Sequence, residues 1–187
     1  MLISFTGAQS SGKTTLLNHW NDCRNHWNVI PEITRKLKRR GFDINDNGSN
    51  YIDTQIAILA DHLNNIFLYA NTETTGITVD TILDRCIIDG FIYTRYFRME
   101  GKVDEFTDRM FTKMFKRYIS KYDYIFYTSP YNVALINDGE RSMSESFRNK
   151  IIKLYEDLII DKYPNVFVLE GSVETRYNKM IEIMYHE

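Results

Sequence analysis

The chain has 187 residues, which is enough for one domain with a sheet covered by helices on both faces. Its formal net charge of −2 excludes a general affinity for nucleic acid or anionic membranes, although a local basic patch remains compatible with it. The two cysteines, Cys23 and Cys86, lack the spacing of a metal site, and no apolar run is long enough to span a membrane. We therefore expect a single cytoplasmic domain at 1–187, in the host cytoplasm if the isoleucine- and asparagine-rich composition reflects a phage source.

The motif G-x-x-x-x-G-K-[ST] near the start of the chain is the pattern of a phosphate-binding loop. An apolar, strand-like run at 2–5 precedes it and a helix is expected directly after it, so a cleavable signal is not expected. Glycines let backbone N–H groups point at a phosphate, and the helix N-terminus adds partial positive charge. We predict that Lys13 contacts the β- and γ-phosphates of ATP and that the Thr14 hydroxyl binds Mg²⁺. The expected nucleotide-binding residues are Gly7, Ala8, Gln9, Ser10, Ser11, Gly12, Lys13, Thr14 and Thr15.

Short apolar runs alternate with helical patterns along the rest of the chain. After the first strand, the predicted elements are strand 27–30, helix 34–41, helix 51–70, strand 78–83, helix 91–99, helix 105–119, strand 122–127, a helix capped by Ser142 and Glu145, strand 166–169 and a helix capped at 171–172. Helix 105–119 is expected to carry Phe106, Met110, Met114 and Tyr118 on one side. Short, continuously apolar strands between helices predict a three-layer α/β/α fold with a five-stranded parallel sheet.

Two clusters of charged residues follow predicted strands, where ligands of a parallel sheet bind. Asp84 suits the Mg²⁺ shell and Arg85 suits a transferring phosphoryl group, with Asp89 beside them, although a purely structural Asp–Arg pair is the alternative. Glu32 is placed to accept a proton from a substrate hydroxyl, with Arg35 three residues later. The alternative for Glu32 is a surface acid beside a basic helix.

A third cluster at 138–141, followed by Arg148, carries arginines on a glycine-containing turn before a helix. Such a segment is typical of a small lid, here at about 137–148, that closes over the phosphates. The alternative is a charged face that is simply solvated. Arg141 would then stabilise charge in the transition state. The residues expected to take part in catalysis are Lys13, Glu32, Asp84, Arg85 and Arg141.

In their order along the chain, these motifs resemble those of the P-loop kinases that include the ribosylnicotinamide kinase domain of the bifunctional nicotinamide-nucleotide adenylyltransferase regulator and its phage relatives. The segments that carry the resemblance are 7–14, 31–35, 83–85 with 89–93, and 138–141, so it covers nearly the whole chain. The resemblance implies a nucleoside- or nucleotide-kinase fold with ATP on the loop. It also implies an acceptor site formed by Glu32, Arg35, Asp84, Arg85 and Asp89.

Three functions remain open at this point. The first is ATP-dependent transfer of the γ-phosphate to a hydroxyl or phosphate of a small nucleoside or nucleotide. The second is a non-kinase ATPase, although Arg85 replaces the glutamate that motor ATPases place after the acid. The third is a kinase that acts on a hydroxyl in nucleic acid, such as a modified base or strand end, which requires the basic run 35–40 to lie beside the site. The sequence does not choose an acceptor, and a dimer is compatible with it.

Overall fold

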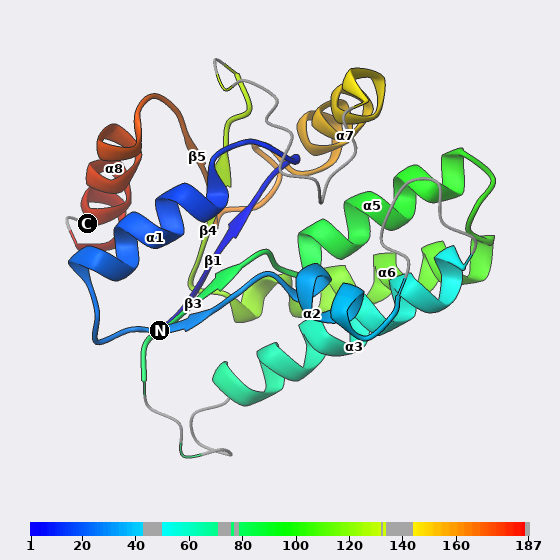
Figure 1. Ribbon diagram of the computed structural model, residues 1–187, viewed down its shortest axis with the longest axis horizontal. Coiled ribbons are helices and arrows are strands. Elements are labelled where there is room, and N and C mark those ends of the chain that lie inside the picture. The colour runs from blue at the N-terminus through cyan, green and yellow to red at the C-terminus, as the bar shows by residue number, and fades with distance from the viewer. Residues whose placement is uncertain (43–49, 71–75, 77–78, 132, 134–143, 186–187) are drawn as a thin grey trace.

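Five parallel strands form one sheet in the order β2-β3-β1-β4-β5 (Figure 1). The computed structural model describes residues 1–42, 50–70, 76, 79–131, 133 and 144–185. The strands are β1 (Leu2–Thr6), β2 (Asn28–Ile30), β3 (Thr81–Asp84), β4 (Tyr124–Thr128) and β5 (Val166–Leu169). The central strand β1 pairs in parallel with β3 on one side and β4 on the other. The predicted five-stranded parallel sheet is confirmed.

Helices cover both faces of this sheet, as a three-layer fold requires (Figure 1). The helices are α1 (Lys13–Cys23), α2 (Ile33–Arg39), α3 (Tyr51–Tyr69), α5 (Ile87–Met99), α6 (Glu105–Tyr118), α7 (Glu145–Leu158) and α8 (Val173–Tyr185), with a 3₁₀ turn η1 (Ile119–Lys121). Helices α1 and α8 pack on one face around Trp20 and Phe126. Helices α3, α5, α6 and α7 pack on the other, around Phe91 and Ile125. Among the described helices, none has both the length and the apolar character needed to cross a bilayer.

The most buried side of α6 is shifted from the predicted one, on which Met110, Met114 and Tyr118 pack only partly buried against the core. Phe106 is 74% exposed, whereas Phe111 and Phe115 are fully buried. The ring of Phe115 stacks on Phe91 of α5 with 4.5 Å between the ring centroids. Aromatic rings bury more apolar area than methionine side chains, so Phe111 and Phe115 lie in the core and Met110 is only partly buried against it.

Two helices also begin at other residues than expected. Helix α5 begins at Ile87 because the Asp89 carboxylate accepts a hydrogen bond from the Cys86 N–H (3.0 Å) and caps the first turn. The predicted cap of α7 at Ser142 is wrong, since α7 begins at Glu145 and the Ser144 hydroxyl accepts from the Phe147 N–H at 3.2 Å.

Candidate active site

The loop between β1 and α1 is shaped by its glycines and by contacts with β4. Gly7 has φ of +139°, and a Cβ atom there would lie 3.0 Å from the Thr128 carbonyl oxygen. No other residue type fits this approach, because the neighbouring atom is rigid backbone. The Ser11 and Thr128 hydroxyls are hydrogen-bonded at 2.6 Å. The glycine-bearing turn predicted from the motif is therefore anchored to the carboxyl end of β4.

Lys13 is folded back over this loop. Its Nζ donates to the carbonyl oxygens of Gly7 (2.8 Å) and Ala8 (2.7 Å) and to the Ser11 hydroxyl (3.2 Å). Burial, together with the charge of Arg85, lowers the pKa of the Lys13 ammonium to about 7. The Lys13 ammonium thus lies at the loop, as predicted. It donates to backbone carbonyl oxygens, and a bound nucleotide would offer phosphate oxygens in their place.

The two side chains expected to hold Mg²⁺ are in contact: Thr14 lies at the start of α1, after β1, and Asp84 lies at the end of the neighbouring strand β3. The Thr14 hydroxyl donates to Asp84 Oδ2 at 3.0 Å, because β3 lies beside β1 and ends level with the loop. Asp84 Oδ1 is buried and has no partner among the described residues. Burial, and next the charge of Glu32, raise the pKa of Asp84. A hydroxyl and a carboxylate oxygen with an unused acceptor position fit Mg²⁺, which prefers one or two protein oxygens with water and phosphate completing its shell.

Arg85 connects the end of β3 to the residues predicted to bind the acceptor. Its φ of +85° is a left-handed conformation that non-glycine residues rarely adopt. The side chain donates from Nε to Glu32 Oε1 at 2.6 Å and from a terminal nitrogen to Asp89 Oδ1 at 2.7 Å. Burial alone would lower the pKa of Arg85, but Glu32 and the other surrounding groups raise it well above its ordinary value. Arg85 is a permanent, buried cation held between two carboxylates.

Asp89 uses both oxygens to connect different parts of the site. Oδ2 accepts from the Thr6 hydroxyl at 2.8 Å and from the Cys86 N–H at 3.0 Å. Oδ1 accepts from Arg85 and from the Tyr155 hydroxyl of α7, at 2.7 and 3.0 Å. The bonds from Thr6, Cys86 and Tyr155 fix the Asp89 carboxylate, and this carboxylate in turn positions Arg85. Direct contact of Asp89 with substrate stays a prediction.

Glu32 and Arg35 extend the cluster toward the surface. Glu32 follows β2, is 7% exposed, and accepts from the Thr34 hydroxyl at 2.7 Å in addition to Arg85. Arg35 lies 3.4 Å from the other oxygen of Glu32, and 41% of its side chain is exposed. The structure therefore brings together Glu32, Arg35, Arg85 and Asp89, and it makes Glu32 a buried residue instead of a surface acid.

The predicted lid falls only partly on the residues that the structure describes. Arg141 and the rest of 138–141 lie outside them. Arg148, in the first turn of α7, donates to the carbonyl oxygens of Pro130 and Val133, both at 3.0 Å, and to that of Ser10 at 3.4 Å. The start of α7 is therefore in contact with the phosphate-binding loop.

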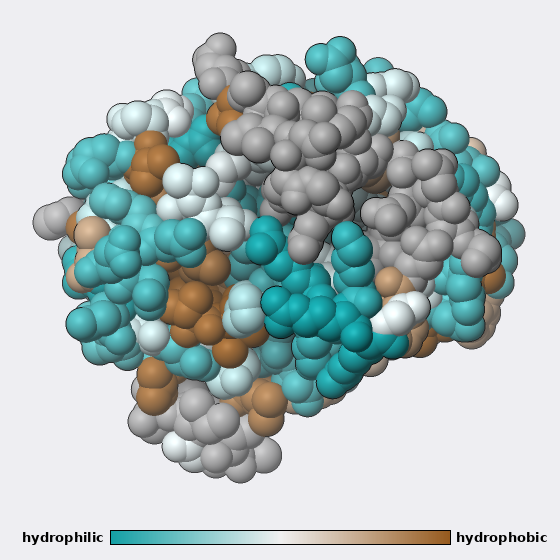
Figure 2. All heavy atoms as spheres, viewed as in Figure 1, coloured by the Kyte–Doolittle hydropathy of each residue, from teal (hydrophilic) through white to brown (hydrophobic). Residues whose placement is uncertain are grey.

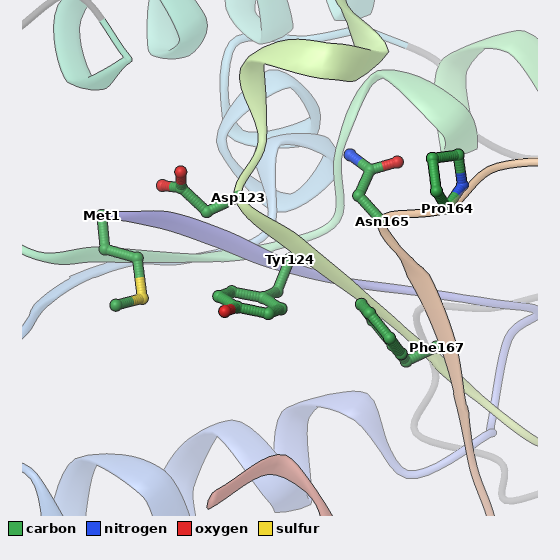
Figure 3. Close-up of a pocket in the computed structure, with 6 residues that line it drawn as sticks. All are labelled: Met1, Asp123, Tyr124, Pro164, Asn165 and Phe167. Atoms are coloured by element: carbon green, nitrogen blue, oxygen red, sulfur yellow. The ribbon is translucent and has the colours of Figure 1, made fainter. Parts of the chain in front are cut away.

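A hollow of about 390 Å³ lies at the opposite edge of the sheet, at the amino ends of the strands (Figure 3). Its lining residues are Met1, Asp123, Tyr124, Pro164, Asn165 and Phe167. The carboxylate of Asp123 accepts the Leu2 N–H at 2.6 Å, which gives it a structural role. The hollow takes no part in the site at the carboxyl edge.

One buried arginine that contacts the loop was not predicted from the sequence. Arg176 of α8 is 3% exposed. Its guanidinium donates to the carbonyl oxygens of Ser11 (2.7 Å), Ser129 (3.0 Å) and Gly171 (3.0 Å). The available signal was its i, i+4 spacing with the buried Met180, which places an arginine on the inward face of an amphipathic helix.

Replacing Arg176 is expected to loosen the phosphate-binding loop. Arg176→Ala leaves three carbonyl oxygens without this donor, so we expect a loss of about 2–4 kcal/mol in stability and weaker nucleotide binding. Arg176→Lys, which keeps the charge but not the planar fork, should recover only part of both. Thermal unfolding and ATP titration would measure the two effects. Unchanged ATP affinity in a destabilised Arg176→Ala variant would contradict a role at the loop.

Comparison with known proteins agrees with this geometry. A family model described as an AAA domain matches residues 2–176. Among solved structures, the chain is similar to a deoxyadenosine kinase from M. mycoides bound to dCMP and dCDP, with 15% identity, a TM-score of 0.69 and full coverage of both chains. It is similar to NadR in complex with NR at 20% identity and a TM-score of 0.70, over 99% of this chain and 50% of that one. Thymidylate kinase from Candida albicans matches at 14% identity and a TM-score of 0.63, over 99% and 91% of the two chains.

A search of curated protein sequences finds no match. The identities to the solved structures are low, so these likenesses show the fold, which is that of the P-loop nucleoside and nucleotide kinases. The family model spans most of the chain. The predicted kinase-type fold is therefore confirmed, and the chain belongs to the AAA domain family matched by that model.

Proposed function

We propose that this protein is an ATP- and Mg²⁺-dependent phosphotransferase that moves the γ-phosphate of ATP to a hydroxyl or phosphate of a small nucleoside or nucleotide. The observation that carries the proposal is an adjacency at one edge of the sheet. Asp84, the last residue of β3, accepts a hydrogen bond from the Thr14 hydroxyl. The next residue in the chain, Arg85, is ion-paired with Glu32. The proposed donor site includes Asp84 and the proposed acceptor site includes Arg85, so the two sites meet at consecutive residues. The kinases among the similar structures support the same class of reaction.

The donor half consists of the loop, Lys13, Thr14 and Asp84. The inward N–H groups of the loop and the start of α1 would bind the β-phosphate. Lys13 would exchange the Gly7 and Ala8 carbonyl oxygens for phosphate oxygens. Thr14 and Asp84 would hold Mg²⁺, which neutralises charge on the phosphates when bound.

The acceptor half consists of Glu32, Arg35 and Arg85. We assign Glu32 as the general base that takes the proton from an acceptor hydroxyl while that oxygen bonds to the γ-phosphorus and ADP leaves. A general base must be ionised, and Arg85 and Arg35 provide the counter-charges for Glu32. Arg85 is buried and permanently charged, so it is suited to the transferring phosphoryl group. Arg141 is assigned to the closed lid.

A screen with γ-labelled ATP tests this proposal. Nucleosides, nucleoside monophosphates, nicotinamide riboside and a DNA oligonucleotide would each be offered as acceptor, with EDTA-treated reactions as the control. We expect label on a nucleoside or nucleotide and none after EDTA. ATP hydrolysis that runs equally fast without any acceptor would instead identify a non-kinase ATPase.

A second candidate is a kinase for a hydroxyl in nucleic acid. The observation that favours it is the position of α2, whose basic residues begin three positions after Glu32. Label on the oligonucleotide alone in the same screen would select this candidate.

A further inference from the structure

Helix α2 presents a stripe of cations to solvent beside the acceptor cluster. Ile33 and Leu37 are its buried residues and pack with Ile58 of α3. Residues at i, i+3 and i+4 are neighbours on a helix surface, so Arg35, Lys38 and Arg39 share the side opposite the buried pair. We call these three residues the α2 stripe. Figure 2 shows the most hydrophilic colouring gathered over α2.

Two of the three cations of the stripe, Lys38 and Arg39, have no ion-pair partner among the described residues, whereas Arg35 is paired with Glu32. Lys36, toward α3, is paired with Asp61 at 3.1 Å. Within the described part of the chain, by contrast, no carboxylate forms an ion pair with Lys38 or Arg39, and both side chains belong to exposed residues. The whole chain carries a net charge of −2, so this is a local concentration of positive charge. Such a concentration attracts anions to this place on the surface.

The stripe begins at the reacting centre. Arg35 is ion-paired with Glu32, and Glu32 is ion-paired with Arg85. From Arg35 to Arg39 the helix rises by about 6 Å, the length of one turn. An acceptor whose reacting group lies at Glu32 would therefore extend its remaining atoms along these cations.

We propose that the α2 stripe binds a phosphate group that the acceptor carries in addition to the group that is phosphorylated. This inference rests on the function proposed above and narrows its acceptor to a phosphate-bearing one, in preference to a free nucleoside. The arginines offer planar N–H forks that match phosphate oxygens, and Lys38 adds a point charge between them. The phosphate belongs either to a mononucleotide or to the backbone of a polynucleotide, since both present the same chemistry to the helix.

The test combines a charge reversal with a matched control. Lys38→Glu/Arg39→Glu removes two cations of the stripe. Lys113→Glu/Lys116→Glu makes the same change of charge at exposed positions of α6, a helix that contributes no residue to the acceptor cluster. Each protein would be assayed for kcat/KM with a nucleoside and with its 5′-monophosphate. Binding of a labelled single strand of about ten nucleotides would be followed by anisotropy at several salt concentrations, with the monophosphate as competitor.

We expect the stripe variant to lose about tenfold or more of the wild-type preference for the phosphate-bearing acceptor, or of its affinity for the oligonucleotide. The control variant should keep both. If the affinity for the oligonucleotide depends on salt through several ionic contacts, and that dependence falls in the stripe variant, the acceptor is a polynucleotide. If the oligonucleotide binds weakly and the kcat/KM advantage of the monophosphate over the nucleoside is lost in the stripe variant, the acceptor is a mononucleotide.

Three results would overturn the inference: equal effects in both variants, no effect on either probe, or a wild-type preference for the free nucleoside. Failure of the proposed function looks different, because label then reaches no acceptor at all. In that case, binding of the labelled strand, and direct binding of the monophosphate measured by calorimetry, still decide the role of the stripe in the wild-type and variant proteins.

Discussion

Lys13→Ala is expected to lower the rate of phosphoryl transfer by about three orders of magnitude while the protein remains folded. Lys13 is the loop's own side-chain cation, and its Nζ already lies within hydrogen-bond distance of Gly7 and Ala8. Phosphoryl transfer depends mainly on positioning and charge stabilisation, so no other group of the loop replaces the ammonium. Single-turnover transfer of labelled phosphate measures the loss, and circular dichroism checks the fold. Near-normal transfer by a folded variant would remove the loop from the mechanism.

The pH dependence of ATP binding gives a second measurement on the same residue. With its pKa lowered to about 7, Lys13 loses its proton in the free protein as the pH rises through that value. Bound phosphates favour the ammonium form, so ATP binding takes up a proton above pH 7, and affinity should fall toward alkaline pH. Calorimetry in buffers of different ionisation enthalpy measures the uptake. Lys13→Arg, whose guanidinium stays charged, should abolish this uptake; an identical uptake in that variant would contradict the assignment.

Asp84→Asn and Glu32→Gln are expected to impair the reaction in different ways. Asp84 has a buried oxygen that bonds to none of the described residues, and the Thr14 hydroxyl is beside it. Its amide variant should therefore raise the Mg²⁺ concentration needed for half-maximal rate. Glu32 is assigned as the base, so Glu32→Gln should lower the rate by about 10²–10⁴-fold and remove the acidic limb of the pH–rate profile. Its Mg²⁺ requirement should remain that of the wild type. Mg²⁺ titrations and pH profiles of both variants provide the measurements.

One outcome would exchange the roles of metal ligand and base between Asp84 and Glu32, and the raised pKa of Asp84 is the reason to test for it. A carboxylate whose pKa is raised is also suited to accept a proton, and Asp84 is in this state through burial and the charge of Glu32. If Asp84→Asn erased the acidic limb while Glu32→Gln behaved like the wild type, Asp84 would be the base. Glu32 would then serve to hold Arg85.

The sheet and the clustering at its carboxyl edge were predictable because they follow from local patterns. A phosphate-binding loop needs a strand before it and a helix after it, and parallel strands bring Glu32 and Asp84 to the same edge. In the sheet, β3 lies beside β1 and β2 lies beyond β3, so Glu32 is one strand farther from the loop than Asp84. This separation is compatible with the assignment of Asp84 to Mg²⁺ and of Glu32 to the acceptor hydroxyl.

The features that were not predictable depend on contacts between distant parts of the chain or on the choice between neighbouring cap residues. Arg176 reaches Ser11 across 165 positions in the sequence, and no local pattern encodes that contact. The buried side of α6 was decided by the stacking of Phe115 on Phe91, which periodicity alone does not specify. The cap of α7 is Ser144, two residues after the predicted Ser142. Sequence patterns do not fix the ends of helices to within one or two residues.

The four hydrogen bonds of Asp89 have a consequence for how the specificity of the proposed kinase can be redesigned. Because one carboxylate holds Thr6, Arg85 and Tyr155 together, any substitution that shifts it disturbs β1, Arg85 and α7 at the same time. Lys38 and Arg39 make no bond to that carboxylate. Directed evolution toward a new acceptor is therefore expected to accumulate its early substitutions on α2 and to leave Asp89 intact, and sequencing of selected variants would show whether it does.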